Sequence, residues 1–132
     1  MRVLGGTNSR PQVLLVEDDV LLLDVMSAAL KREGYTFETA RSGDEALEKA
    51  YALRPDVVLL DIELPGQSGY LVAAKLKVAA PSPKVLFLTA LPRGQSDRAA
   101  AFLRVDGIMH KPFALRKLIS TVDRLLGFAQ AA

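Results

Sequence analysis

The chain reads Pro55-Asp56-Val57-Val58-Leu59-Leu60-Asp61-Ile62-Glu63-Leu64-Pro65-Gly66 near its middle, and this segment indicates the fold class more clearly than any other. Its four consecutive apolar residues, 57–60, predict a strand buried on both faces, as strands in parallel sheets are. Asp61 follows directly, at the carboxyl end of that strand, where open α/β sheets bind ligands. The turn residues Pro65-Gly66 predict that Asp61 is presented in a loop.

Strands and helices alternate along the rest of the chain. Apolar runs predict strands at 13–16, 36–40, 56–60, 84–88 and 107–110, and helical spacing predicts helices at 20–33, 43–53, 70–78, 96–104 and 113–126. We therefore predict an α/β fold, a doubly wound (βα)5 arrangement in which a five-stranded parallel sheet carries helices on both faces. Residues 12–128 form the expected domain, 1–11 a flexible N-terminal arm and 129–132 a short tail.

The first predicted helix has a clear apolar side, and a capping box precedes the second. Ser42 stands three residues before Glu45, the spacing of reciprocal side-chain and backbone hydrogen bonds at a helix start. In the first helix the cluster 21–23 is assigned to the core. The expected buried stripe is Leu22, Val25, Met26, Ala29 and Leu30.

The composition excludes several classes of protein. The chain has 132 residues, 50% of them hydrophobic, and contains no apolar run near the ~20 residues that cross a bilayer. It has no cysteine, which favours the cytoplasm and excludes disulfides and thiolate metal sites. The net charge is +2 without a basic run, so we expect neither direct nucleic-acid binding nor membrane binding.

Polar and charged residues follow four of the five predicted strands. Glu17 and Asp18 follow the first strand, Asp61 the third, Thr89 the fourth and Lys111 the fifth. All parallel strands end at one edge, so these groups converge there. Clustered carboxylates suit a hard cation such as Mg²⁺. A carboxylate beside Mg²⁺ can be a nucleophile toward phosphorus, with an ammonium and a hydroxyl stabilising the transferred phosphoryl group.

Each residue taken singly also has a purely structural interpretation. Asp61 could be a turn former, Thr89 a cap and Lys111 a surface lysine. The acidic run 17–19 could favour the start of a helix through its dipole, and we assign Asp19 to that role. The convergence of all of them on one edge is what favours a functional site.

The chain resembles the receiver domains of two-component response regulators, the CheY-like family. The motifs that match are Leu15-Val16-Glu17-Asp18-Asp19, Asp61-Ile62-Glu63-Leu64-Pro65-Gly66 with Ser68-Gly69, Leu88-Thr89-Ala90, and Lys111-Pro112-Phe113. The resemblance covers residues 12–127.

The resemblance implies a role for each site residue. Asp61 is the expected phosphoacceptor, Thr89 the switch hydroxyl and Lys111 the cation that pairs with the phosphoryl group. The expected Mg²⁺ ligands are Glu17, Asp18, Asp61 and the backbone carbonyl of Glu63. The resemblance also implies a cis peptide bond before Pro112.

The resemblance further implies a signalling protein and not an enzyme. The expected phosphoryl donor is a histidine kinase or a histidine phosphotransfer protein. The expected output is a change in affinity for an unidentified downstream protein, through the face formed by the fourth helix, fifth strand and fifth helix. The same face is the expected contact of a homodimer. We expect this domain to act without an attached output domain.

Two positions depart from the family pattern. Ile108 stands where many receivers carry an aromatic residue, and Arg104-Val105-Asp106-Gly107 replaces a loop that commonly contains Gly-Ala. These departures keep open a second hypothesis, a degenerate receiver that acts as a constitutive interaction module. A third is a Mg²⁺-dependent phosphatase with an aspartyl intermediate, since Asp61-Ile62-Glu63 weakly resembles an Asp-x-Asp motif.

Overall fold

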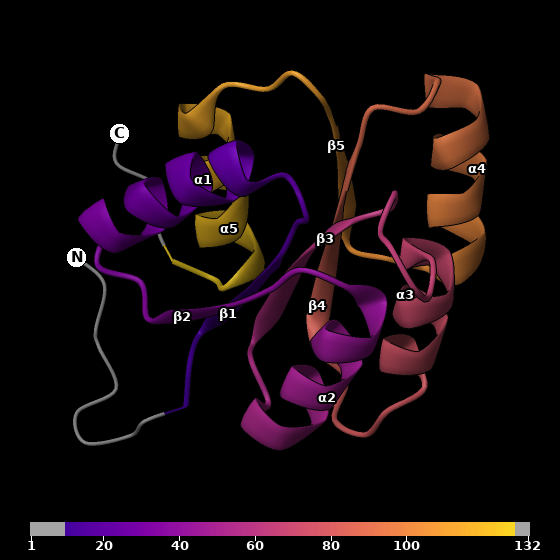
Figure 1. Ribbon diagram of the computed structural model, residues 1–132, viewed down its shortest axis with the longest axis horizontal. Helices are drawn as coiled ribbons and strands as arrows, with labels where there is room; N and C mark the ends of the chain where they lie inside the picture. The colour runs from indigo at the N-terminus through magenta and orange to yellow at the C-terminus, as the bar shows by residue number, and fades with distance from the viewer. Residues whose placement is uncertain (1–9, 129–132) are drawn as a thin grey trace.

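Residues 10–128 are described by the structure, a computed structural model of the chain. Five strands and five helices alternate without exception in this range (Figure 1). They are β1 (Val13–Val16), α1 (Val20–Arg32), β2 (Phe37–Ala40), α2 (Gly43–Leu53), β3 (Val57–Asp61), α3 (Gly69–Lys77), β4 (Lys84–Thr89), α4 (Arg93–Leu103), β5 (Gly107–His110) and α5 (Leu115–Leu125).

The strands form one parallel sheet in the order β2-β1-β3-β4-β5, which confirms the predicted fold class. The register aligns Val16 with Leu60 and Asp61 with Leu88. β1, β3 and β4 therefore end side by side. Because each strand is parallel to its neighbours, the five carboxyl ends share one edge of the sheet.

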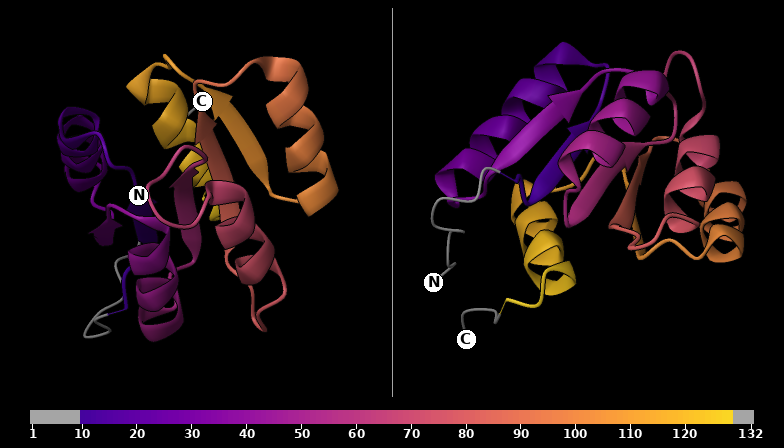
Figure 2. Two further views of the ribbon diagram at one scale, coloured as in Figure 1. Left: turned by 45° about the vertical axis from the view of Figure 1, so that its right-hand side comes forward. Right: turned by 90° about the horizontal axis from the view of Figure 1, so that it is seen from below.

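Helices cover both faces of the sheet. Figure 1 shows α1 and α5 on one side and α2, α3 and α4 on the other, and Figure 2 shows α3 lying between α2 and α4. Leu59 belongs to the hydrophobic cluster under α1 and α5, whereas its neighbour Leu60 belongs to the cluster under α2 and α3. Period-2 alternation in a fully apolar strand thus supplies both cores.

Side-chain caps begin three of the helices. Asp19 accepts hydrogen bonds from the amides of Leu21 and Leu22 at the start of α1, as expected. Ser42 accepts from the amide of Glu45 at the start of α2. Glu45 returns its bond to the amide of residue 41 instead of that of Ser42, so only half of the predicted capping box forms.

The gap between β3 and α3 is closed by an unusually close backbone contact. The amide of Gly69 donates to the carbonyl of Ile62 at 3.0 Å. A Cβ atom on Gly69 would lie 2.5 Å from the Ile62 Cα and 2.6 Å from the Asp61 carbonyl oxygen. Only glycine permits this approach, which packs the start of α3 against the end of β3.

The structure corrects several local predictions. α4 begins at Arg93 and not at 96, and Gly94 within its first turn explains why the pattern missed it. Leu21 and Val25 are exposed on α1, so the buried stripe is Leu23, Met26, Ala29 and Leu30. Arg104 ends α4 with a φ of 58°, the left-handed conformation that glycine adopts most easily.

The two predicted terminal segments lie mostly outside the residues that the structure describes. Residues 1–9 of the predicted arm and the tail 129–132 lie outside the described residues. Arg10 pairs with Asp56, with 3.0 Å between guanidinium and carboxylate, and Pro11 is buried. Within residues 10–128, every helix is too short or too polar to span a bilayer.

Candidate functional site: an acidic cluster at the carboxyl edge of the sheet

Glu17 and Asp18 follow β1 and differ sharply in burial. Glu17 is completely buried, whereas Asp18 is exposed. The amide of Asp18 donates to the Glu17 carboxylate at 3.1 Å. Asp19 turns away to cap α1. The strand end thus supplies one buried and one accessible carboxylate, and the third acid of the run has the structural role predicted for it.

Asp61 is buried, contrary to the prediction that a loop presents it to solvent. It is the last residue of β3 and only 2% exposed. The β3–β4 ladder continues past it, because the amide of Ile62 donates to the carbonyl of Leu88 at 3.0 Å. The turn at Pro65-Gly66 comes too late in the chain to free the carboxylate. Asp61 Oδ1 accepts from the amide of Glu63 at 3.0 Å.

Lys111 lies between the two buried carboxylates. Its Nζ is 2.7 Å from Glu17 Oε1 and 3.3 Å from Asp61 Oδ2. The Lys111–Pro112 peptide bond is cis, as the resemblance implied. The amide of Lys111 also donates to the carbonyl of Thr89 at 2.7 Å, which joins the ends of β4 and β5.

Thr89 ends β4 and is fully buried. Its hydroxyl accepts from the amide of Leu91 at 2.8 Å, and it donates to Glu63 Oε1 at 3.3 Å. The same Glu63 oxygen accepts from the amide of Ala90 at 3.0 Å. Glu63 is therefore bonded through its side chain and its amide. The assignment of its backbone carbonyl as a metal ligand stays a prediction.

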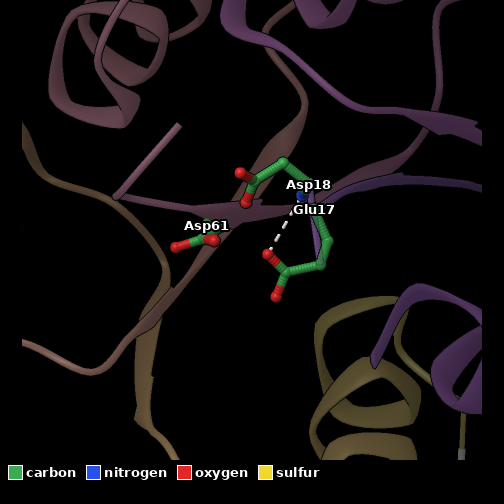
Figure 3. Close-up of side chains that lie close together, drawn as sticks. All are labelled: Glu17, Asp18 and Asp61. Atoms are coloured by element: carbon green, nitrogen blue, oxygen red, sulfur yellow. Dashed lines mark hydrogen bonds between the residues drawn. The ribbon is translucent and has the colours of Figure 1, made fainter. Parts of the chain in front are cut away.

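Three carboxylates are close enough to share one cation. Figure 3 shows Glu17, Asp18 and Asp61 gathered at one point, and one oxygen from each lies within 4.8 Å of the others. Oxygen ligands in this number and spacing fit a hard divalent ion such as Mg²⁺, which binds through one or two carboxylates and keeps several waters. The residues present fit the predicted metal.

The electrostatics of the cluster show an excess of negative charge. Burial and the hydrogen bond and charge of Glu17 raise the pKa of Asp61 to about 8. Burial acts in the same direction on Glu17, but hydrogen bonds to Asp61 and Lys111 and the lysine charge hold the pKa of Glu17 below its ordinary value. Burial lowers the pKa of Lys111, and the two acids more than reverse this, so it stays charged. One lysine thus faces two buried acids, and a cation would complete the neutralisation.

Two contacts near the site were not predicted. The Glu63 side chain reaches Thr89 across the end of the sheet, and His110 Nε2 lies 3.0 Å from Asp97 Oδ1, joining β5 to α4. Both contacts join residues from separate elements, and neither leaves a periodic or spacing signal in the sequence.

A cavity of about 360 Å³ lies elsewhere, at the amino ends of the strands. It is lined by the end of α2, by Pro55 and Asp56 before β3, and by 81–83 before β4. The acidic cluster lies at the opposite edge of the sheet. The two features are therefore independent.

Comparisons with known proteins agree with this geometry. The model of the response regulator receiver domain matches residues 13–123. A curated relative from Mycobacterium tuberculosis, named "Probable transcriptional regulatory protein TcrX", is 37% identical over 114 residues, which are 86% of this chain and 49% of the relative. The chain thus spans about half the length of that protein.

Solved structures of receivers share the fold. The chemotaxis protein CheY4 of Vibrio cholerae has a TM-score of 0.79 at 29% identity, over 86% of this chain and 96% of that one. The response regulator TrrA of Thermotoga maritima, in complex with Mg²⁺-BeF, has a TM-score of 0.77 at 34% identity, also over 86% and 96%. The parallel (βα)5 fold, the acidic cluster at its carboxyl edge and the family match together place this chain in the response regulator receiver domain family of two-component signalling.

Proposed function

We propose that this domain is a phosphorylation-dependent switch and that Asp61 accepts the phosphoryl group, with residues 12–128 as the functional unit. The observation that carries the proposal is the buried position of Asp61 between Lys111 and the acidic pair 17–18. Thr89 ends the neighbouring strand β4, at the same carboxyl edge of the sheet. A carboxylate nucleophile, a cation site, an ammonium and a hydroxyl are the groups that aspartyl-phosphate chemistry needs.

The transfer requires an in-line approach of phosphorus to Asp61. An Asp61 carboxylate oxygen forms the new P–O bond while the P–N bond of a phosphohistidine breaks, and that electron pair stays on the imidazole nitrogen. The histidine belongs to a histidine kinase or a phosphotransfer protein. Lys111 stabilises the negative charge on the transferred oxygens, and Thr89 donates to one of them.

Glu17, Asp18 and Asp61 would hold Mg²⁺, together with the carbonyl of Glu63. When bound, the ion supplies positive charge that favours the ionised, nucleophilic form of Asp61 and neutralises the phosphoryl oxygens. Burial of Glu17 keeps one ligand fixed, and exposure of Asp18 leaves the site open to solvent.

The proposed output is the face formed by α4, β5 and α5. Phe102 on α4 is 86% exposed, an apolar side chain available to a protein partner or to a second copy of this domain. Ile108 on β5 is half-buried and packs against the hydrophobic cluster under α2 and α3. The contact between His110 and Asp97 joins β5 to α4 within this face. We infer that phosphorylation changes the affinity of this face for its partner.

Phosphorylation by acetyl phosphate tests the proposal. The protein is incubated with Mg²⁺ and acetyl phosphate and its intact mass is measured. We expect a gain of one phosphoryl group, lost in Asp61→Ala and in the presence of EDTA. Asp24→Ala, which removes an exposed aspartate of α1, is the matched control and should be phosphorylated like the unsubstituted protein.

The other two hypotheses give different outcomes in this experiment and in a phosphatase assay. No mass gain in any variant would favour a constitutive interaction module. Catalytic release of inorganic phosphate from p-nitrophenyl phosphate, lost in Asp61→Ala, would favour a phosphatase. The complete set of acids, hydroxyl and lysine supports the phosphorylation switch over both.

A further inference from the structure

The Glu63 carboxylate occupies two hydrogen-bond donors at the edge of the candidate site. Glu63 Oε1 accepts from the Thr89 hydroxyl at 3.3 Å and from the amide of Ala90 at 3.0 Å. Glu63 lies two residues after the end of β3, whereas the two donors lie at the end of β4 and directly after it. The side chain therefore joins the loop that follows Asp61 to the end of β4.

The Thr89 hydroxyl has no second proton to offer. A hydroxyl carries one proton and two acceptor lone pairs. Thr89 gives its proton to Glu63 and uses a lone pair to accept from the amide of Leu91 at 2.8 Å. A phosphoryl oxygen on Asp61 can therefore receive the Thr89 proton only if Glu63 gives it up.

A carboxylate and a phosphoryl group bind the same kinds of hydrogen-bond donor. Both are planar or tetrahedral arrays of anionic oxygens that accept charge-assisted hydrogen bonds from hydroxyls and backbone amides. Of the donors around Asp61, Lys111 is committed to the two buried acids, and Thr89 and Ala90 are committed to Glu63.

We propose that Glu63 is an internal competitor of the phosphoryl group: its carboxylate holds Thr89 and Ala90 in the unphosphorylated protein and is displaced from them when Asp61 is modified. This inference rests on the proposed function. Glu63 itself is exposed, so its side chain can leave for water without a large desolvation cost. Its amide stays bonded to Asp61 Oδ1 at 3.0 Å, which ties the release of the side chain directly to events at the acceptor.

The competition predicts that the contact weakens phosphoryl binding. Removing the carboxylate leaves Thr89 and Ala90 free, so a phosphoryl analogue no longer has to break two charge-assisted bonds. We expect Glu63→Ala to bind beryllium fluoride with Mg²⁺ about tenfold more tightly than the unsubstituted protein. Glu48→Ala removes an exposed glutamate of α2 and is the charge-matched control, with unchanged affinity expected.

A second variant separates hydrogen bonding from simple charge repulsion. Glu63→Asp keeps the negative charge but shortens the side chain by one methylene, so it no longer reaches both donors. Competition through hydrogen bonds predicts that Glu63→Asp binds beryllium fluoride as tightly as Glu63→Ala. Repulsion alone predicts that it behaves like the unsubstituted protein, and that result would overturn the proposal.

Amide signals provide a readout that needs no phosphoryl analogue. In the free protein, Glu63→Ala and Glu63→Asp should both shift the NMR signal of the Ala90 amide and speed its hydrogen exchange. Equal beryllium fluoride affinity in all variants would refute the competition while leaving the phosphorylation switch intact. Failure of every variant, and of the unsubstituted protein, to bind beryllium fluoride or to gain a phosphoryl group would instead count against the proposed function itself.

Discussion

Asp61 and Glu17 form a buried acidic pair with only one lysine between them. Two carboxylates whose oxygens lie within 4.8 Å of each other cannot both ionise without cost, and burial adds to that cost. The pKa of Asp61 is accordingly raised to about 8. In the folded protein without metal, ionisation of Asp61 is therefore unfavourable at the position where the proposed chemistry needs an ionised oxygen. A site that binds a cation has a physical reason to be built in this way.

The raised pKa of Asp61 predicts that the stability of the metal-free protein depends on pH. Between about pH 4, where Asp61 titrates in the unfolded chain, and about pH 8, the folded state binds the extra proton, so the free energy of unfolding falls as pH rises. The lowered pKa of Glu17 acts the other way, but only in more acidic solution. In EDTA near pH 8, Asp61→Asn should be more stable than the unsubstituted protein by about 1–3 kcal/mol.

Urea denaturation at about pH 5 and about pH 8 measures this difference. The gap between Asp61→Asn and the unsubstituted protein should narrow at the lower pH, where Asp61 is already protonated. Asp24→Asn on the exposed side of α1 should show no pH-dependent gap. A gap of the same size at both pH values would mean that the ionisation of Asp61 is not its source.

The segment from β3 to α3 positions Asp61, the proposed acceptor, through backbone contact and not through side chains. Gly69 lies against the Ile62 Cα and the Asp61 carbonyl, with no room for a Cβ atom. Any side chain there would push α3 away from the end of β3. The Ile62–Gly69 hydrogen bond would then be lost, and the residues next to Asp61 would shift.

Gly69→Ala should therefore lower the free energy of unfolding by about 2–3 kcal/mol. The matched control is Gly94→Ala in α4, where an added Cβ meets no neighbouring atom. It should raise stability by about 0.5 kcal/mol, because alanine loses less backbone entropy in a helix. Thermal unfolding of both variants checks the pair, and destabilisation of equal size in both would contradict the close-contact argument.

Elements with strong periodic or apolar signals were predictable from sequence, and their contacts were not. The run 57–60 predicted β3 and the edge on which Asp61 lies, because burial on both faces demands continuous apolar residues. α4 was predicted three residues too late, because its start has a glycine and no side-chain cap. The burial of Asp61 and the reach of Glu63 to Thr89 depend on how the sheet register aligns β3 with β4. A single sequence does not encode that register locally.

One sheet serves two hydrophobic clusters, so the two faces of the molecule depend on the same strands. Leu59 and Leu60 are adjacent, both fully buried, and point into opposite clusters. Loss of packing on either face removes support from the same central strand. We therefore expect the described domain to unfold as one cooperative unit.

Leu59→Ala and Leu60→Ala test this dependence. Each should lower the free energy of unfolding by about 3 kcal/mol, without splitting the transition. Tyr35 belongs to the cluster under α1 and α5, and Tyr70 packs beside the other cluster, so fluorotyrosine NMR reports each face separately. Both signals should disappear at the same urea concentration in both variants. Separate midpoints for Tyr35 and Tyr70 would show that the faces unfold independently.

The parallel arrangement of the sheet has one further effect, on the electric field of the molecule. Each helix returns the chain from the carboxyl edge of the sheet to the amino edge, so α1, α2, α3 and α4 all begin near the edge that holds Asp61. Their peptide dipoles add along the helix axes, and the positive ends face that edge. The backbone itself therefore opposes part of the negative charge that collects there, independently of any ion or lysine side chain.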